Sequence, residues 1–376
     1  MGKVIAFDRN RLRSKSQPGF AHRTTSQAGS QARSHAQAGS GSRIHAFPQR
    51  KEEIQVSIII PACGQPQLLS QCLASLTSQK FEAGRYEIIV VDAGPNTSTR
   101  DIVADWAQHA SRHGPSISHL PLHGSVGTAA ARNRGWRVAR GHIVAFLDED
   151  VIVRSDWLEK AWDAFDEDVG AVWGRIMSPV EKSSAFNTIS LPPEQQSVFQ
   201  ISNYFVRKET LHEVGGFDER FTAAWGEEAD LYFRLAEQPR RVVHHPRLIA
   251  SHTMCEADAG KLLAKQRQHL WMALLYKKHP QLYQQKIRSL SYWNYYAVTI
   301  MLLLALVGFM AGVAALGSAA LLAWLGLSLR LARRQRHKAD ADNPRLLSSM
   351  ASTVLGPPLA VFWHVAGMLR FRTAYF

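Results

Sequence analysis

One segment of the chain, from Tyr295 to Leu329, contains no charged residue over 35 positions. A membrane-spanning helix needs roughly 20 apolar residues, so this segment could form one long span or two short ones. Five basic residues follow it closely: Arg330, Arg333, Arg334, Arg336 and Lys338. Basic residues favour the cytosolic side of a membrane, so we predict a hairpin that turns near Gly317-Ser318 and returns this cluster to the cytosol. The alternative is a buried hairpin inside a soluble protein.

A third apolar segment, residues 346–369, is interrupted by Gly356-Pro357-Pro358 and contains His364. It could span the membrane, re-enter it, or lie at its surface. We assign residues 291–376 as a whole to membrane anchoring. Each arm of the hairpin 295–329 would be about 17 residues long, so we expect the helices to tilt or the bilayer to thin around them.

Residues 1–50 have a different composition, with nine Lys and Arg against one acid, Asp8. Ser, Gln, Ala and Gly dominate the rest, and the few large apolar residues cannot build a core. We therefore predict a disordered basic tail, and no apolar run here resembles a secretory signal. The tail is either simply solvated or contacts an anionic membrane surface or an acidic partner.

The three cysteines, Cys63, Cys72 and Cys255, form no CxxC pair and are odd in number. This spacing does not indicate a disulfide framework or a zinc site, and it fits a reducing, cytosolic setting.

Residues 51–290 show the pattern of an α/β domain. Three apolar runs predict buried strands: VSIIIPA (56–62), YEIIVVDAG (86–94) and HIVAFLDED (142–150). The segments 67–79, 98–110 and 125–140 have helical spacing of their apolar residues. Continuous apolar strands that alternate with helices indicate a mostly parallel sheet covered on both faces.

Polar residues follow these strands where each one ends. The first ends at Pro61-Ala62, the second reaches Asp92, and the third runs into Asp148 and Asp150. Ligands of such sheets bind at the carboxyl ends of the strands, so we expect these residues to share one ligand-binding edge. The sequence has no GxGxxG and no Walker lysine loop, which disfavours dinucleotide-binding and P-loop readings.

Four motifs in order resemble family 2 glycosyltransferases of the GT-A fold, over about 200 residues. They are VSIIIPACGQPQLLSQCLASLTSQ, EIIVVDAGPNTST, GTAAARNRGWRVARGHIVAFLDED and FVRKETLHEVGGFDERFTAAWGEEADLYFRL. The resemblance implies a GT-A nucleotide-sugar-binding domain followed by membrane helices.

The resemblance implies roles for the acids and for a later histidine. A nucleotide-sugar donor leaves as a diphosphate, whose charge requires a hard cation, Mg²⁺ or Mn²⁺, with oxygen ligands. Asp150 would bind this metal, Asp148 the donor ribose or the metal, and His252 would be a further metal ligand. The alternatives are that the acids only cap the next helix and that His252 has a structural role, although Ser155 is the better cap for that helix.

Other residues would contact the donor by the same resemblance. Asp92 occupies the position that reads the nucleotide base, Arg132 the position that approaches the donor, and Pro61-Ala62 completes this edge. The structural alternatives are a turn cap for Asp92 and a surface ion pair for Arg132. Cys63-Gly64 and Ala93 depart from the usual family residues, so the base is left open.

An inverting transfer needs a base on the acceptor hydroxyl. The resemblance places Glu228 at the position where the family usually has a catalytic Asp. Glu227 and Asp230 are the alternatives, with positioning or helix N-terminal roles.

The family's processive polymerases carry a QxxRW motif, which KQRQHLW (265–271) does not match. We therefore predict transfer of a single sugar to a lipid-linked or cell-envelope glycan acceptor, with no nucleic-acid partner. The expected location is the inner (cell) membrane, with the catalytic domain in the cytoplasm. A basic helix at 261–279 either lies on the membrane surface or packs as an ordinary amphipathic helix. The alternative functions are a catalytically silent membrane scaffold and a nucleotidyltransferase.

Overall fold

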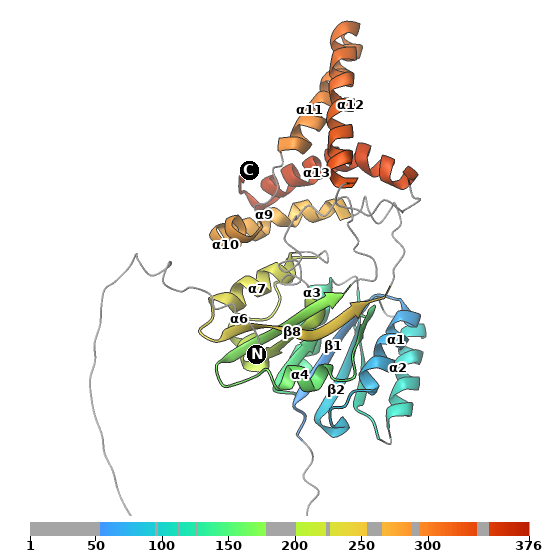
Figure 1. Cartoon of the computed structure of the whole chain (residues 1–376), viewed down its shortest axis with the longest axis vertical. Helices are drawn as coiled ribbons and strands as arrows, with labels where there is room; N and C mark the ends of the chain where they lie inside the picture. Colours follow the sequence, from blue (N-terminus) through green and yellow to red (C-terminus); the bar gives the residue numbers. More distant parts are fainter. Residues whose placement is uncertain are drawn as a thin grey trace, which may run out of the picture.

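The computed structural model describes residues 53–94, 97–111, 113–124, 127–177, 201–222, 226–253, 265–287, 293–336 and 346–375. The predicted tail 1–50 and the first four residues of the predicted basic helix, 261–264, lie outside these ranges. Figure 1 shows an α/β domain, a layer of helices beyond it, and a helical hairpin that projects from this layer.

One eight-stranded sheet organises the α/β domain, in the order β3-β2-β1-β4-β7-β6-β8-β5. The strands are β1 (Val56–Ala62), β2 (Tyr86–Asp92), β3 (Ser116–Pro121), β4 (Ile143–Phe146), β5 (Val151–Val153), β6 (Val169–Met177), β7 (Tyr204–Arg207) and β8 (Arg241–His252). β1 to β4 pair in parallel, whereas β7 is antiparallel to both β4 and β6. The predicted α/β class with a largely parallel sheet is confirmed.

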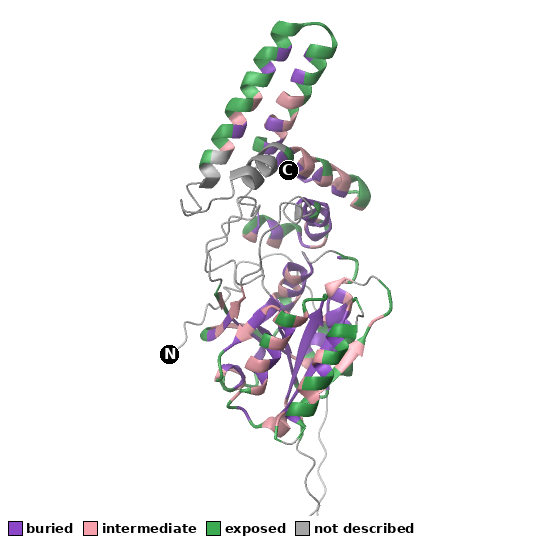
Figure 2. Cartoon of the chain, turned by 90° about the vertical axis from the view of Figure 1, so that its right-hand side faces the viewer, coloured by how far each residue is buried: buried purple, intermediate pink, exposed green. Residues whose placement is uncertain are grey.

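Helices cover both faces of this sheet (Figures 1 and 2). They are α1 (Pro66–Thr77), α2 (Thr97–Ala110), α3 (Thr128–Val138), α4 (Trp157–Trp162), α6 (Lys208–Val214) and α7 (Glu227–Glu237). Alternate residues of β1 point to opposite faces: Ile58 and Ile60 pack in the core beneath α1, and Ile59 packs in the core beneath α3. Each strand residue is thus buried, which explains the unbroken apolar runs of the sequence.

The strand ends differ from the predicted ones by a few residues. β4 stops at Phe146, so all three acids of the LDED stretch lie in the turn beyond the strand. β2 stops at Asp92, two residues earlier than predicted. Asp92 is thus the last residue of its strand, whereas Asp148, Glu149 and Asp150 lie in the turn beyond theirs.

The helices beyond the α/β domain are α9 (Gln268–Lys278), α10 (Pro280–Lys286), α11 (Trp293–Met310), α12 (Ala314–Arg336) and α13 (Leu346–Phe371). In α9, every residue from Gln268 to Leu275 is buried. This part of the predicted basic helix therefore packs inside the molecule, and its position relative to a membrane stays a prediction.

α11 and α12 form the predicted hairpin, and both have the length and apolar composition of membrane-spanning helices. The predicted turn at Gly317-Ser318 is wrong, because the chain turns at residues 311–313, where Gly312 has a φ of 74°. Gly317 instead lies inside α12 at the closest approach of the two arms. A Cβ added to Gly308 would lie 2.8 Å from the Gly317 nitrogen, so small residues are needed here.

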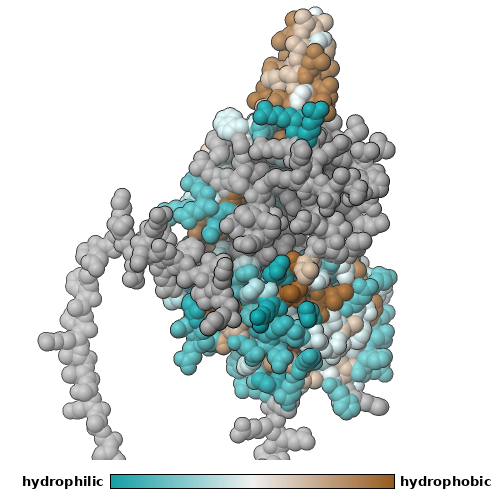
Figure 3. Space-filling view, viewed as in Figure 1, coloured by the Kyte–Doolittle hydropathy of each residue, from teal (hydrophilic) through white to brown (hydrophobic). Residues whose placement is uncertain are grey.

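The third apolar segment forms one helix, α13, which continues through Pro357 and Pro358. The predicted interruption at these prolines is therefore wrong. α13 lies across the hairpin and against α9 (Figure 1). Figure 3 shows apolar residues over the projecting hairpin and a hydrophilic band at its base.

Candidate functional site

The predicted site residues gather at the carboxyl edge of the parallel strands. Parallel pairing of β1 and β2 sets Ala62 beside Asp92, at the ends of both strands. β4 lies on the other side of β1, with Phe146 beside Ile59. The turn that carries the three acids therefore starts next to the end of β1.

Asp148, Glu149 and Asp150 contact three different parts of the fold. Asp148 accepts hydrogen bonds from Arg132 of α3 and from Ser202, which lies in a short 3-10 helix, η4 (Ile201–Asn203). Glu149 accepts hydrogen bonds from the backbone of the loop after β1. Asp150 lies beside His252 at the end of β8. Each of the three acids that follow β4 therefore contacts a different part of the fold.

Asp148 is held in its ionised form. Its Oδ1 atom lies 2.9 Å from Nη2 of Arg132, and its Oδ2 atom accepts the Ser202 hydroxyl. Burial alone would raise the pKa of Asp148, but the charge of Arg132 and these hydrogen bonds outweigh it and lower the pKa. About a quarter of the side chain, 27%, stays exposed, so its oxygens can accept a further hydrogen bond from a ligand.

Glu149 has a role that the sequence did not reveal. Its Oε1 atom accepts the amide of Cys63 at 2.9 Å, and its Oε2 atom accepts the amide of Gln65 at 3.4 Å. Burial and the neighbouring aspartates raise the pKa of Glu149, against the effect of the two amides. The carboxyl group fixes the loop after Pro61-Ala62, on which the donor-binding prediction depends.

Asp150 and His252 come together because β5 pairs with β8, which sets Val151 beside His252. The Oδ1 atom of Asp150 lies 3.3 Å from Nδ1 of His252, and each side chain is about a quarter exposed. The Asp150 carbonyl also accepts the Thr253 amide at 2.8 Å, which secures this junction.

This pair suits a divalent cation in part. A carboxylate oxygen and an imidazole nitrogen already converge, and both groups reach solvent. Among the described residues, no group of three or more His, Cys, Asp or Glu could hold a metal ion. Mg²⁺ typically has few protein ligands, because waters and phosphates complete its shell. The residues present therefore fit a metal that a diphosphate helps to hold.

Arg132 lies deeper than the predicted approach to the donor, with 3% of its side chain exposed. Its guanidinium contacts Asp148 at 2.9 Å, Glu227 at 3.2 Å and Glu228 at 3.6 Å. The surface ion pair that we considered as an alternative is thus wrong. Arg132 joins α3, the acidic turn and the start of α7 through one buried charge.

The three acids at the start of α7 have different surroundings. Glu227 is fully buried and accepts hydrogen bonds from Thr128 and Arg132. Asp230 is also fully buried and pairs with Arg234, Lys278 and His279. Glu228 alone of the three remains partly exposed, with 25% of its side chain accessible. Of these three acids, only Glu228 reaches solvent.

The pKa of Glu228 lies well above its ordinary value. Burial is the main cause, and the charges of Glu227 and Asp148 act in the same direction, while Arg132 opposes them. A general base works best when its pKa is near the working pH. The environment of Glu228 moves its pKa in that direction.

Asp92 is fully buried at the end of β2. Its Oδ1 atom accepts the Gly94 amide at 3.2 Å, and His119 of β3 lies 3.3 Å from its Oδ2 atom. His119 could not be predicted from the sequence, because β3 has no strong apolar pattern. The side chain of His119 is 17% exposed, so it lies between Asp92 and solvent.

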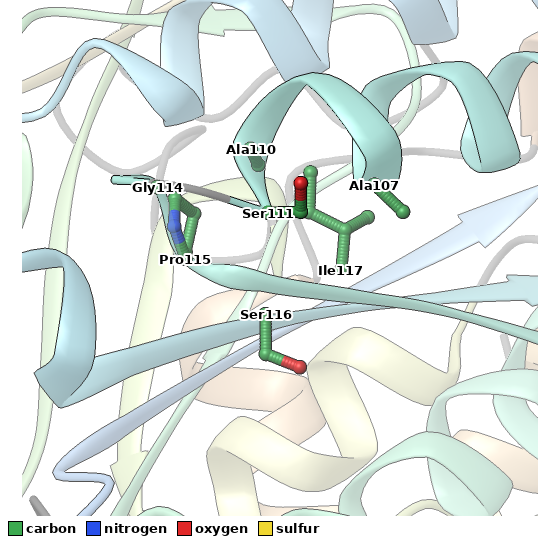
Figure 4. A pocket seen from close by; sticks show the side chains of 7 residues that line it. All are labelled: Ala107, Ala110, Ser111, Gly114, Pro115, Ser116 and Ile117. Carbon is green, nitrogen blue, oxygen red and sulfur yellow. The ribbon is translucent and has the colours of Figure 1, made fainter.

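A separate hollow lies between the end of α2 and the start of β3, next to Ser111, Pro115 and Ser116 (Figure 4). Its lining residues include no charged group, and it lies at the opposite end of β3 from the acidic edge. It offers nothing that would bind a diphosphate.

Comparison with protein families identifies the chain. The model of glycosyl transferase family 2 matches residues 57–218, and that of glycosyl transferase family group 2 matches residues 143–333, just over half of the chain. Together the two matches cover nearly all of the sheet and the hairpin, with the acidic turn and α7 between them.

Curated relatives carry glycosyltransferase names. The chain is 29% identical to glycosyltransferase AglE of Haloferax volcanii over 172 residues, which are 43% of this chain and 55% of the relative. It is 30% identical to the pre-mycofactocin glycosyltransferase of Mycobacterium tuberculosis over 215 residues, 52% of this chain and 42% of the relative. The chain thus spans about half the length of the curated relatives it matches.

Among solved structures, the fold is similar to the mannosyltransferase PcManGT of Pyrobaculum calidifontis, solved with GDP-Man and Mn²⁺. The TM-score is 0.50 at 18% identity, over 85% of this chain and 87% of the other. The predicted family and fold are confirmed: the chain belongs to glycosyl transferase family 2 and has a GT-A-type fold.

Proposed function

We propose that the protein is a metal-dependent, inverting glycosyltransferase. It transfers one sugar from a nucleotide-sugar donor to a lipid-linked or cell-envelope glycan acceptor. The names of the curated relatives and the family matches support a sugar transfer. The site geometry supports the finer statements on the reaction.

The observation that carries the proposal is the arrangement around Arg132. One guanidinium contacts both Asp148, in the acidic turn, and Glu228, at the start of α7. Asp148 of the predicted donor edge and Glu228, the partly exposed acid at the start of α7, therefore meet at one nitrogen, Nη2 of Arg132. An inverting reaction needs such a pair of positions, one for the leaving group and one for the base.

In the proposed reaction, Glu228 accepts the proton of the acceptor hydroxyl as its oxygen attacks the anomeric carbon. The new C–O bond forms on the face opposite the nucleoside diphosphate, and the bond between the anomeric carbon and the phosphate oxygen breaks. Asp92 and His119 would contact the nucleotide base, and the loop after Pro61-Ala62 would lie against it. A bound Mg²⁺ or Mn²⁺ would neutralise charge on the diphosphate, and Asp150 and His252 would hold it.

The two apolar helices support a membrane location, with the α/β domain on the cytoplasmic face of the inner membrane. The catalytic domain would span residues 51–290 and the anchor residues 291–376. A two-helix anchor is small for a polymer channel, which supports transfer of a single sugar. α13 packs on α9 and lies across the hairpin, so we place it at the membrane surface rather than through it.

A donor panel tests the proposal. Membranes that contain the protein are incubated with nucleotide sugars in Mn²⁺, in Mg²⁺ and in EDTA, and transfer to endogenous acceptors is followed with radiolabelled sugar. We expect one donor class to be used, only with metal, and the product to have the opposite anomeric configuration by NMR. Transfer that proceeds equally in EDTA, or with retention, would contradict the proposal.

A further inference from the structure

A buried cluster of charges joins α7 to the helices on the membrane side. Asp230 lies in the first turn of α7 and is fully buried. Its Oδ2 atom accepts hydrogen bonds from Arg234, from Nε at 2.9 Å and from Nη2 at 2.6 Å. Its Oδ1 atom lies 3.0 Å from Nε2 of His279 and pairs with Nζ of Lys278. Both of these partners come from the junction between α9 and α10.

Lys278 also reaches the loop after α6. Its ammonium group donates to Oδ2 of Asp218 at 2.6 Å, while 20% of its side chain is exposed. Arg234 closes the same cluster from the other side, because its Nη1 atom donates to the carbonyls of Val214 at 2.6 Å and Gly216 at 2.7 Å. The α6 loop, α7 and the end of α9 are thus joined by one hydrogen-bonded set.

The two acids of this cluster, Asp218 and Asp230, stay ionised. Burial would raise the pKa of Asp230, but the hydrogen bond from His279 and the charges of Arg234 and Lys278 lower it, so the carboxylate stays ionised. The pKa of Asp218 is lowered in the same way by Arg220 and Lys278. Removal of one partner from a buried ion pair leaves an uncompensated charge, so the cluster resists separation.

Apolar contacts continue this connection toward the hairpin. Phe221, Ala229 and Phe233 pack in one core with the α9 residues Leu270, Trp271 and Leu274. On its far side, α9 meets α13 so closely that a Cβ on Gly367 would lie 2.6 Å from the Leu270 carbonyl oxygen. The start of α7 is therefore connected through α9 to α13, which in turn packs against α11.

Glu228 lies two residues before Asp230, in the same first turn of α7. A helix is stiff over this distance, so a shift of α7 against α9 would move both side chains together. We infer that Lys278 and His279, acting through Asp230, are positioning residues that fix Glu228 at a set distance from the membrane-side helices. The acceptor that they serve is one presented at the membrane surface, so this inference rests on the proposed function.

The test compares Lys278→Met, which keeps the aliphatic stem, with Lys278→Arg, which keeps the charge. Lys277→Met is the matched control, since it removes the same charge from the same helix and its ammonium group contacts only the Phe371 carbonyl among the described residues. Each full-length variant is assayed in vesicles for kcat, for the KM of the acceptor and for the dissociation constant of the donor. Thermal unfolding is measured in parallel.

We expect Lys278→Met to lower kcat over the acceptor KM by about 10- to 100-fold, because a displacement of about 1 Å of a catalytic group is this costly. Donor binding should change less than about twofold, since the ion pairs of Lys278 are with Asp218 and Asp230 and not with the residues of the predicted donor edge. Lys278→Arg should recover most of the activity, and Lys277→Met should match the wild type.

Three results would overturn the inference. The first is a Lys278→Met variant with unchanged kcat over the acceptor KM, and the second is an equal loss of this activity in Lys277→Met and Lys278→Met. The third is a loss of donor binding and thermal stability in parallel with activity, which would indicate a merely structural role. Failure of the proposed function is a different outcome, because the wild-type protein itself would then transfer no sugar.

Discussion

Arg132 and Asp148 form a 2.9 Å ion pair in which the guanidinium is buried and the carboxylate is partly exposed. The same guanidinium faces Glu227 and Glu228, so one cation contacts three acids at the centre of the site. The pair connects α3, which covers the sheet, with the turn that carries the predicted metal ligand. Disturbing it should affect both the fold and the reaction.

Arg132→Met should therefore destabilise the protein by about 3–5 kcal/mol, because three buried or largely buried carboxylates lose the cation that they share. Arg137→Met is the control, since Arg137 is half exposed and its pair with Glu219 is 3.4 Å long. The control should change the free energy of unfolding by less than about 0.5 kcal/mol. Denaturant unfolding of both variants in detergent makes the comparison, and similar values for the two would refute this reading of Arg132.

Asp150→Ala should abolish metal-dependent binding of the donor and leave the fold intact, because Asp150 reaches solvent and the hydrogen bond that secures its turn to Thr253 is made by its backbone carbonyl, which the substitution keeps. Titration calorimetry with a nucleotide sugar in Mn²⁺ and in EDTA measures the effect. Asp156→Ala is a suitable control, since Asp156 pairs with Lys160 on α4 and lies outside the proposed site. If donor binding by Asp150→Ala still depended on Mn²⁺, residues other than Asp150 would have to bind the metal.

The pH profile should report the raised pKa of Glu228. A general base must be deprotonated to work, so kcat should fall as the pH drops through the pKa of Glu228, which is above that of an ordinary glutamate. The acidic limb of the profile should thus appear at higher pH than a normal carboxyl group would give. Glu228→Gln should lower kcat by roughly 10² to 10⁴ with little change in donor affinity.

Glu228→Asp should retain part of the activity, since it shortens the same acid by one methylene. Near wild-type transfer by Glu228→Gln, together with an inactive Glu227→Gln, would assign the base to Glu227 instead.

Cys63 offers a probe of the donor edge. Its side chain is exposed, but desolvation and the charges of Glu149 and Asp148 raise the pKa of its thiol to about 11. In a Cys255→Ser background, labelling by a maleimide should be slow at neutral pH and faster as the pH rises, because the thiolate is the nucleophile. Cys72 is buried and should not react. A bound nucleotide sugar should protect Cys63, and labelling that the donor does not slow would place the donor elsewhere.

Topology can be tested with reporter fusions. A fusion after Lys338 should be cytosolic, on the same side as residue 51, and a reporter inserted at Gly312, in the turn of the hairpin, should be on the opposite side. A fusion after Lys338 on the outer side would mean that only one helix spans. It would also refute the cytoplasmic return of the basic cluster.

Much of the first half of the domain could be predicted because it is locally encoded. β1 and β2 are buried on both faces, so their apolar runs are continuous, and α1 to α3 follow with clear spacing. The acidic turn could be predicted for the same reason, since a carboxylate directly after a buried strand must be near the sheet edge.

The parts that could not be predicted depend on distant contacts. The amides that Glu149 binds belong to a loop 84 to 86 residues earlier, and the partner of Arg132 in α7 is 95 residues away. The turn of the hairpin was misplaced because Gly317 suits both a turn and a close helix contact. Only the approach of Gly308 to Gly317 distinguishes these two uses.

The pairing of β5 with β8 has a consequence for the order in which the protein matures on the ribosome. Val151 and His252 are neighbours in the sheet, so the Asp150–His252 half-site cannot form until residue 252 has left the exit tunnel. The chain emerges at about 5–20 residues per second and domains fold as it does so. The first four strands end at Phe146, so they leave the tunnel well before residue 252. The apolar helix α11 begins at Trp293, shortly afterwards. A nascent chain should therefore complete the Asp150–His252 pair, which we propose as the metal ligands, only shortly before α11 emerges, so that the proposed site and the proposed anchor become available almost together.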